Sequence, residues 1–251
     1  MNKVDSILNK LLPLVSIAAI VLLWIVAGAL VDSEYILPTV GQTLTALLNL
    51  FKSSEFYKAL SFTLLRSLIA FIISFALGFL LAFCKNRLPI VGKLIDPVIS
   101  VIRALPTIAI ILLLLFWTNS KVAPIIVTML VVLPTSYTHL CSAFAGINKG
   151  AVEAGKVDGA NGKQLFVFIE FPQIAPPFYK AMGSGISLNF KLMVAAEVLA
   201  QTANSIGYML NTSKIYFEIA EMMALVLVSV AIGVLIETIF NKIAEYSSDW
   251  M

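Results

Sequence analysis

Long apolar segments separated by short polar connections run along the whole chain. A helix of roughly 20 apolar residues crosses the hydrocarbon core of a bilayer, and these segments reach that length. We therefore predict six transmembrane helices, at residues 11–31, 63–84, 92–117, 122–146, 174–203 and 219–240. Because no polar connection is long enough to form a soluble domain, we expect residues 1–251 to form one all-helical integral membrane domain.

Three segments depart from a plain spanning pattern. The third span contains Pro97 and Pro106, and we expect it to be bent because proline lacks a backbone donor and kinks a helix. Residues 40–51 carry apolar side chains at helical spacing on one side, which predicts a helix lying along the membrane interface. Residues 11–31 could be a signal peptide, but their apolar run exceeds the usual length of about 7 to 15 residues. That length favours a retained anchor.

Composition supports a membrane protein. Hydrophobic residues make up 60% of the chain and charged residues 12%, whereas soluble domains average about 45–50% and about 25%. The net charge of +3 is small, and basic residues in a membrane protein more often mark cytoplasmic loops than a nucleic-acid surface. We expect the chain to lie in the lipid bilayer and to bind no nucleic acid.

Lysine and arginine are distributed unequally between the two sides of the predicted spans. Ten flank the spans on the side of the termini: Lys3, Lys10, Lys85, Arg87, Lys93, Lys149, Lys156, Lys163, Lys180 and Lys242. Four lie in the opposite loops: Lys52, Lys58, Lys121 and Lys214. Because positive side chains favour the cytoplasmic side, we predict that both termini and the connection after the fourth span are cytoplasmic.

Several polar side chains fall inside the predicted spans. A charge there costs about 2.5–3.5 kcal/mol on insertion scales and usually faces protein or water. Lys191 lies well inside the fifth span with Ser187 and Asn189 nearby in sequence, and it could attract an anionic substrate. It could also pair with a buried acid or extend outward. Glu197 lies about 240° further around the same helix, so it does not share a face with Lys191.

Arg103 and His139 complete the candidate residues of a substrate path. Arg103 precedes Pro106 and could either line a path or stabilise the bend by donating to free carbonyls. His139 follows a run of polar residues in the fourth span, where a hydrogen bond to another helix is more common than a proton relay.

The connection between the fourth and fifth spans is polar, and its composition predicts a cytoplasmic helix at about residues 151–165. Glu153 near the amino end suits the helix dipole. Gly155, Gly159 and Gly162 are poor helix formers and suggest a bend or the close approach of another backbone. A solvated loop is the alternative.

This connection resembles the EAA signature of bacterial ABC importer permeases, commonly written E-A-A-x3-G-x9-I-x-L-P. The chain reads E-A-G-x3-G-x9-I-x-F-P from Glu153 to Pro172, with Gly155 and Phe171 as departures. In that family the motif forms a coupling helix that docks in a cleft of the ATPase subunit. The resemblance implies a docking surface formed by Glu153, Ala154, Gly155, Asp158, Gly159, Ala160 and Lys163.

Other segments are similar to the nitrate, sulfonate and taurine importer group, which also includes permeases for thiamine-precursor pyrimidines. These segments are Tyr35–Thr39, Leu65–Arg66, Leu94–Pro97, Arg103–Pro106 and Val194–Glu197. The resemblance implies a type I ABC importer permease fold in the bacterial inner membrane. It also implies alternating access that moves a small organic anion inward, with a pyrimidine as the alternative substrate.

The same resemblance implies the partners. They are a second copy of the chain, a dimer of ATPase subunits that holds ATP and Mg, and an extracytoplasmic substrate-binding protein. That binding protein would meet the outer connections at residues 32–61 and 204–218. The chain itself would bind no cofactor.

The sequence contains no pattern typical of a catalytic or metal site. It has no GxxxxGK[ST], HExxH or GxSxG segment, and Cys84 and Cys141 have no metal-binding spacing. We therefore predict a transport subunit without a catalytic site. A stand-alone carrier or channel commonly has an internal repeat, and a membrane enzyme needs a nucleophile and base or paired carboxylates. Neither pattern is evident here.

Overall fold

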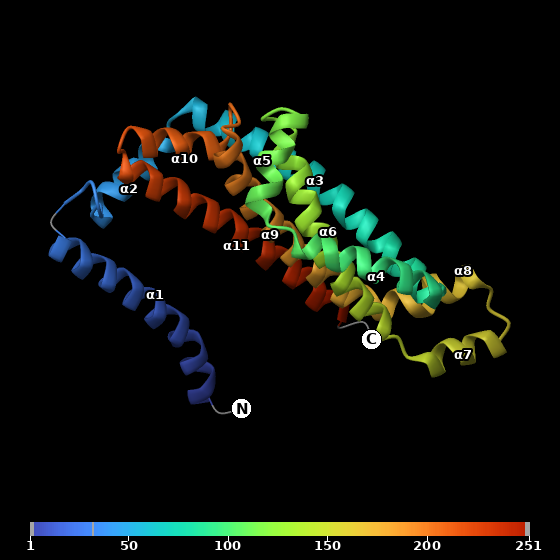
Figure 1. Ribbon diagram of the computed structural model, residues 1–251. Coiled ribbons are helices and arrows are strands. Elements are labelled where there is room, and N and C mark those ends of the chain that lie inside the picture. Colours follow the sequence, from blue (N-terminus) through green and yellow to red (C-terminus); the bar gives the residue numbers. More distant parts are fainter. Residues whose placement is uncertain (1–2, 32, 249–251) are drawn as a thin grey trace. The chain divides into compact units, whose positions relative to one another are not determined.

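The computed structural model describes residues 3–31 and 33–248, and throughout that part of the chain every regular element is a helix (Figure 1). The predicted all-helical class is confirmed. Asp32, where the first outer connection was predicted to begin, lies outside the described residues. The chain divides into two compact units, Met1–Tyr57 with Met209–Val228, and Lys58–Tyr208 with Ser229–Met251.

The first unit contains α1 (Lys3–Val31), α2 (Val40–Leu50), most of α10 (Ile206–Ile215) and the start of α11 (Ile219–Ser248). Thr39 begins α2 through a capping box with Gln42, which satisfies free amide groups at the start of the helix. Trp24 Nε1 donates to the Pro38 carbonyl at 3.0 Å and joins α1 to the connection that follows it. The short helix predicted at residues 40–51 corresponds to α2.

The second unit contains most of α3 (Ser54–Arg87), α4 (Pro89–Ala104), α5 (Thr107–Trp117), α6 (Ala123–Ala145) and α9 (Phe171–Ala200). Helices α6 and α9 pack along each other. Aromatic rings from three helices fill the core beside them, with ring centroids 5.2–6.3 Å apart: Phe71, Phe75, Phe79, Phe83, Phe144 and Phe178. Edge-to-face and offset pairs at these distances are the favourable aromatic geometries.

The third predicted span is two helices rather than one bent helix. Helices α4 and α5 meet at an angle of 92°. Leu105 has an extended backbone because the following Pro106 disfavours the helical conformation for the residue before it. Pro97, in contrast, lies inside α4. Of the two prolines that predicted a bend, Pro106 therefore lies at the break.

Three described helices are long and apolar enough to cross a membrane: Ser54–Arg87, Ala123–Ala145 and Ile219–Ser247. The α4–α5 pair counts as a fourth if it forms one broken span, and Ala18–Val31 is a shorter apolar helix. Helix α9 is long enough but carries Lys180, Lys191 and Glu197, which lower its mean hydropathy. Six spans remain a prediction, because length and composition identify up to four in the described residues.

Candidate functional site

The connection that carries the signature is a helix, a turn and a second helical segment rather than the single helix predicted at residues 151–165. Helix α7 (Lys149–Val157) begins at Asn148, whose side chain accepts from the amides of Gly150 and Ala151. Helix α8 (Gly162–Gln164) follows, and the π-helix η1 (Leu165–Glu170) leads directly into α9. In Figure 1, α7 and α8 are joined by an open loop.

Two residues explain the interruption. Gly159 has φ +81°, a left-handed backbone that glycine adopts without steric cost. Asn161 then begins α8 with a capping box to Gln164, so the chain favours a new helix start at this point. The glycines predicted a bend, and Gly159 provides it.

The signature residues of α7 pack against η1. Gly155 is buried, and a Cβ atom at that position would overlap Ile169 Cδ1 and lie 2.9 Å from Leu165 Cδ2. Ile169 is itself the isoleucine of the signature. The glycine that departs from the usual pattern therefore permits close contact between the two halves of the motif in this chain.

Most of the predicted docking residues are on the surface. Glu153, Ala154, Asp158, Gly159 and Lys163 are exposed, Ala160 is half-buried, and only Gly155 is buried. Val157, which is not among the predicted residues, is an apolar side chain that is 87% exposed at the end of α7. Single exposed apolar side chains are common on protein surfaces, so Val157 alone does not identify a contact. In the sequence, only its position between the charged residues Lys156 and Asp158 indicates that Val157 is exposed.

Filling the space at Gly155 is expected to destabilise this segment. Gly155→Leu would overpack the contact with Ile169 and Leu165, which typically costs about 1–3 kcal/mol. The purified protein should unfold at a lower temperature in detergent, as followed by size-exclusion chromatography after heating. Gly162→Leu is the matched control, because a Cβ at Gly162 meets no atom within 4 Å. Equal melting temperatures for the two variants would contradict the packing.

An ion pair connects the end of η1 to the end of α3. Arg87 donates from Nη1 to Glu170 Oε1 at 3.0 Å and from Nη2 to Oε2 at 2.6 Å. The Glu170 side chain is 4% exposed. A bidentate arginine–carboxylate pair fixes orientation as well as distance. In the sequence Arg87 is recognisable only as a charge flanking a span, because no local pattern relates two residues this far apart.

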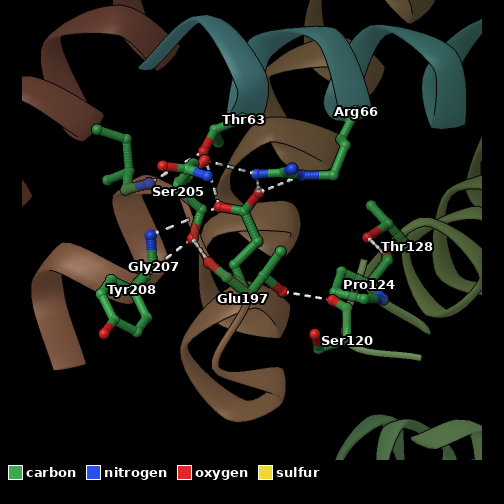
Figure 2. A network of polar contacts seen from close by, with 12 residues as sticks. Thr63, Arg66, Ser120, Pro124, Thr128, Glu197, Ser205, Gly207 and Tyr208 are labelled. Atoms are coloured by element: carbon green, nitrogen blue, oxygen red, sulfur yellow. Dashed lines mark hydrogen bonds and ion pairs between the residues drawn. The ribbon is translucent and has the colours of Figure 1, made fainter. Parts of the chain in front are cut away.

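Glu197, predicted as a path residue, lies in a closed polar network at the carboxyl end of α9 (Figure 2). Its side chain is fully buried. Arg66 Nε donates to Oε1 at 2.8 Å, and Thr63 Oγ1 donates to Oε2 at 2.8 Å. The amide of Ile206 donates to Thr63 Oγ1 at 3.0 Å, and Arg66 Nη2 donates to the Asn204 carbonyl at 3.2 Å. Since these groups occupy both carboxylate oxygens, the geometry favours a structural role.

Two other path candidates contact different neighbours. Asn189 is fully buried and donates from Nδ2 to the Ser67 carbonyl at 2.6 Å. Arg103 Nη2 donates to Thr138 Oγ1 and, at 3.5 Å, to the Pro134 carbonyl, which joins α4 to α6.

His139 is exposed, and its side chain makes no hydrogen bond with any described residue. Of the six path candidates, the structure brings only Lys191 and Ser187 together, one helical turn apart on α9. Within residues 3–31 and 33–248, no group of three His, Cys, Asp or Glu side chains could hold a metal ion.

Solved importer structures share the fold. A methionine ABC transporter crystallised in an inward-facing conformation (MetNI) is 16% identical, with a TM-score of 0.62 over 78% of this chain and 99% of that one. A chain of an amino acid ABC transporter crystallised with histidines is 19% identical, with a TM-score of 0.57 over 78% and 94%. At these identities the likeness concerns the fold alone.

Curated relatives cover most of the chain. The taurine transport system permease protein TauC of Escherichia coli K12 is 22% identical over 233 residues, 90% of this chain and 84% of TauC. The E. coli K12 protein SsuC, named for aliphatic sulfonates transport, is 25% identical over 86% of this chain and 79% of its own length. Its Bacillus subtilis 168 namesake is 20% identical over 93% and 85%.

The family model of the binding-protein-dependent transport system inner membrane component matches residues 74–251, which include the whole signature, η1 and α9. This match covers more than half of the chain, and the apolar helices of the structure agree with a multi-pass membrane protein. The chain belongs to the family of binding-protein-dependent transport system inner membrane components, and it is a permease subunit of an ABC importer.

Proposed function

We propose that this permease imports a small organic anion of the sulfonate class, driven by ATP that a separate subunit binds with Mg and hydrolyses. The observation that carries the proposal is the exposed α7–α8 surface, where five of the seven signature-related residues are accessible to a partner. The names of the taurine and aliphatic sulfonate relatives support the substrate class. No such support favours the pyrimidine alternative or a stand-alone carrier.

The assembly contains two copies of this chain, two ATPase subunits and a binding protein outside the membrane. Both termini and α7 face the cytoplasm, where the ATPase lies. Glu153, Asp158, Gly159 and Lys163 form the contact with the ATPase. The outer connections at residues 32–61 and 204–218 receive the binding protein.

Coupling uses the covalent and ionic connections around η1. Closure of the ATPase dimer on ATP moves α7 and α8 together with η1, because Gly155 packs against Ile169. Segment η1 continues into α9 without a break, and Glu170 holds Arg87 at the end of α3. Motion of the docking surface therefore reaches two long helices and switches the access of the path.

The test is purification of the tagged chain from its native host in mild detergent, with bound proteins identified by mass spectrometry. We expect an ATPase subunit to copurify and to be lost when Glu153 and Gly159 are both altered. Vesicles made from the purified assembly and its binding protein should take up taurine or ethanesulfonate when ATP is supplied. Absence of an ATPase under conditions that preserve such assemblies would contradict the proposal.

A further inference from the structure

Lys191 is a charged side chain deep in α9 without a counter-charge among the described residues. It lies nine residues before the end of the helix at Ala200, which is about 14 Å along the axis at 1.5 Å per residue. It is exposed on the surface of this chain, and no carboxylate of the described part lies within ion-pair distance of its ammonium group. Charges at such depth face a water-filled cavity or another protein surface rather than lipid.

Ser187 lies one turn before Lys191 and is unsatisfied. Its side chain is 1% exposed, and its Oγ atom has no hydrogen-bond partner in the part of the chain that the structure describes. Burying a hydroxyl without a hydrogen-bond partner has a free-energy cost, so such groups are usually paired. A ligand that accepts a hydrogen bond from this hydroxyl would remove the cost.

The Lys191 arm and the Ser187 hydroxyl both lie next to Gly233 of α11. A Cβ atom at Gly233 would lie 3.2 Å from Lys191 Cε and 3.4 Å from Ser187 Oγ. The glycine is buried, so the lysine arm and the hydroxyl both lie against the backbone of α11. The next acid along α11, Glu237, is one turn away and forms no ion pair with Lys191.

We propose that Lys191 and Ser187, which both pack against Gly233 of α11, bind the anionic head of the transported solute within the membrane. The ammonium group supplies a positive charge with three donors, and the hydroxyl supplies a fourth donor. A sulfonate carries one negative charge on three acceptor oxygens and matches this set. This assignment rests on the proposed importer function and extends it by naming the residues that select an anion.

The test uses the assembled importer with its ATPase and binding protein in proteoliposomes. ATP-dependent uptake of radiolabelled ethanesulfonate and ATP hydrolysis stimulated by the loaded binding protein are measured on the same vesicles. Loss of a charge-assisted hydrogen bond is expected to reduce uptake about tenfold to a hundredfold in Lys191→Met. Stimulated ATP hydrolysis should persist, because the docking surface is unchanged.

Matched variants separate charge from structure. Lys191→Arg should keep most of the uptake, and Ser187→Ala and Gly233→Ala should lower it by less than Lys191→Met. Lys180→Met removes a lysine from the same helix and should behave as the wild type. Glu237→Gln should also leave uptake unchanged. A loss in Glu237→Gln as large as that in Lys191→Met would assign Lys191 to an ion pair and overturn the proposal.

The remaining outcomes separate the anion site from the importer function. The anion site is overturned if Lys191→Met takes up the solute normally. It is also overturned if this variant loses both uptake and stimulated ATP hydrolysis. Neither result contradicts the importer function. Wild-type vesicles that show stimulated ATP hydrolysis but import none of ethanesulfonate, taurine or nitrate overturn the anion class and the site together. Absence of both activities in the wild type contradicts the proposed function itself.

Discussion

Arg66→Met is expected to lower the free energy of unfolding by about 3–5 kcal/mol, the usual cost of removing one partner from a buried ion pair. Glu197 is fully buried, and Arg66 supplies its positive charge at 2.7 Å from Nη2 to Oε1. The variant would leave that carboxylate buried with only neutral donors. Thermal unfolding of the detergent-solubilised protein, followed by size-exclusion chromatography, measures the effect.

A double variant and a surface control show whether the ion pair is responsible. Arg66→Met combined with Glu197→Gln removes both charges and should recover part of the loss, because no uncompensated charge stays buried. Lys58→Met removes an exposed lysine from the same helix and should change the melting temperature little. If Arg66→Met and Lys58→Met have the same melting temperature, the network of Figure 2 does not stabilise the fold.

The network also connects the loop after α9 to α3. Gln201 and Asn204 both have left-handed backbones, with φ of 48° and 53°, which are unfavourable for residues other than glycine. Arg66 donates to the Asn204 carbonyl, and Thr63 accepts from the Ile206 amide. These bonds help to hold a strained turn, so loss of Arg66 is expected to loosen the turn as well as the helix pair.

Gly159→Trp is expected to abolish uptake while leaving the protein folded in the membrane. Gly159 is exposed on the proposed ATPase contact, and a Cβ atom there would meet no atom of this chain within 4 Å. The indole would therefore project from the surface and block docking. Uptake by proteoliposomes, with copurification of the ATPase as a second readout, measures the effect.

Backbone strain at Gly159 needs its own control. Any residue with a Cβ atom at φ +81° costs about 1–2 kcal/mol, and Gly159→Ala carries that cost without the bulk. We expect Gly159→Ala to bind the ATPase and to keep measurable uptake. Normal uptake by Gly159→Trp would disprove the docking surface, and equal loss in both variants would assign the effect to the backbone.

Local sequence determined the class of the protein and the place of its signature segment. Apolar segments of spanning length can satisfy their backbone groups in a bilayer only as helices, so the all-helical class followed from the pattern alone. Pro106 predicted the break between α4 and α5 because proline acts on its immediate neighbours. The signature from Glu153 to Pro172 placed the proposed docking segment, since its residues are close in sequence.

Tertiary structure decided which polar residues meet. Arg66 and Glu197 are 131 positions apart, and Arg87 and Glu170 are 83 apart, so no local spacing predicts either pair. Glu197 was predicted to line a path and lies instead in a closed network, because its partner Arg66 is distant in sequence. Lys191 and Ser187 share a helix face that sequence could suggest, but Gly233 joins them from another helix. Contacts of this kind depend on how helices pack, and packing brings together residues that the chain order separates.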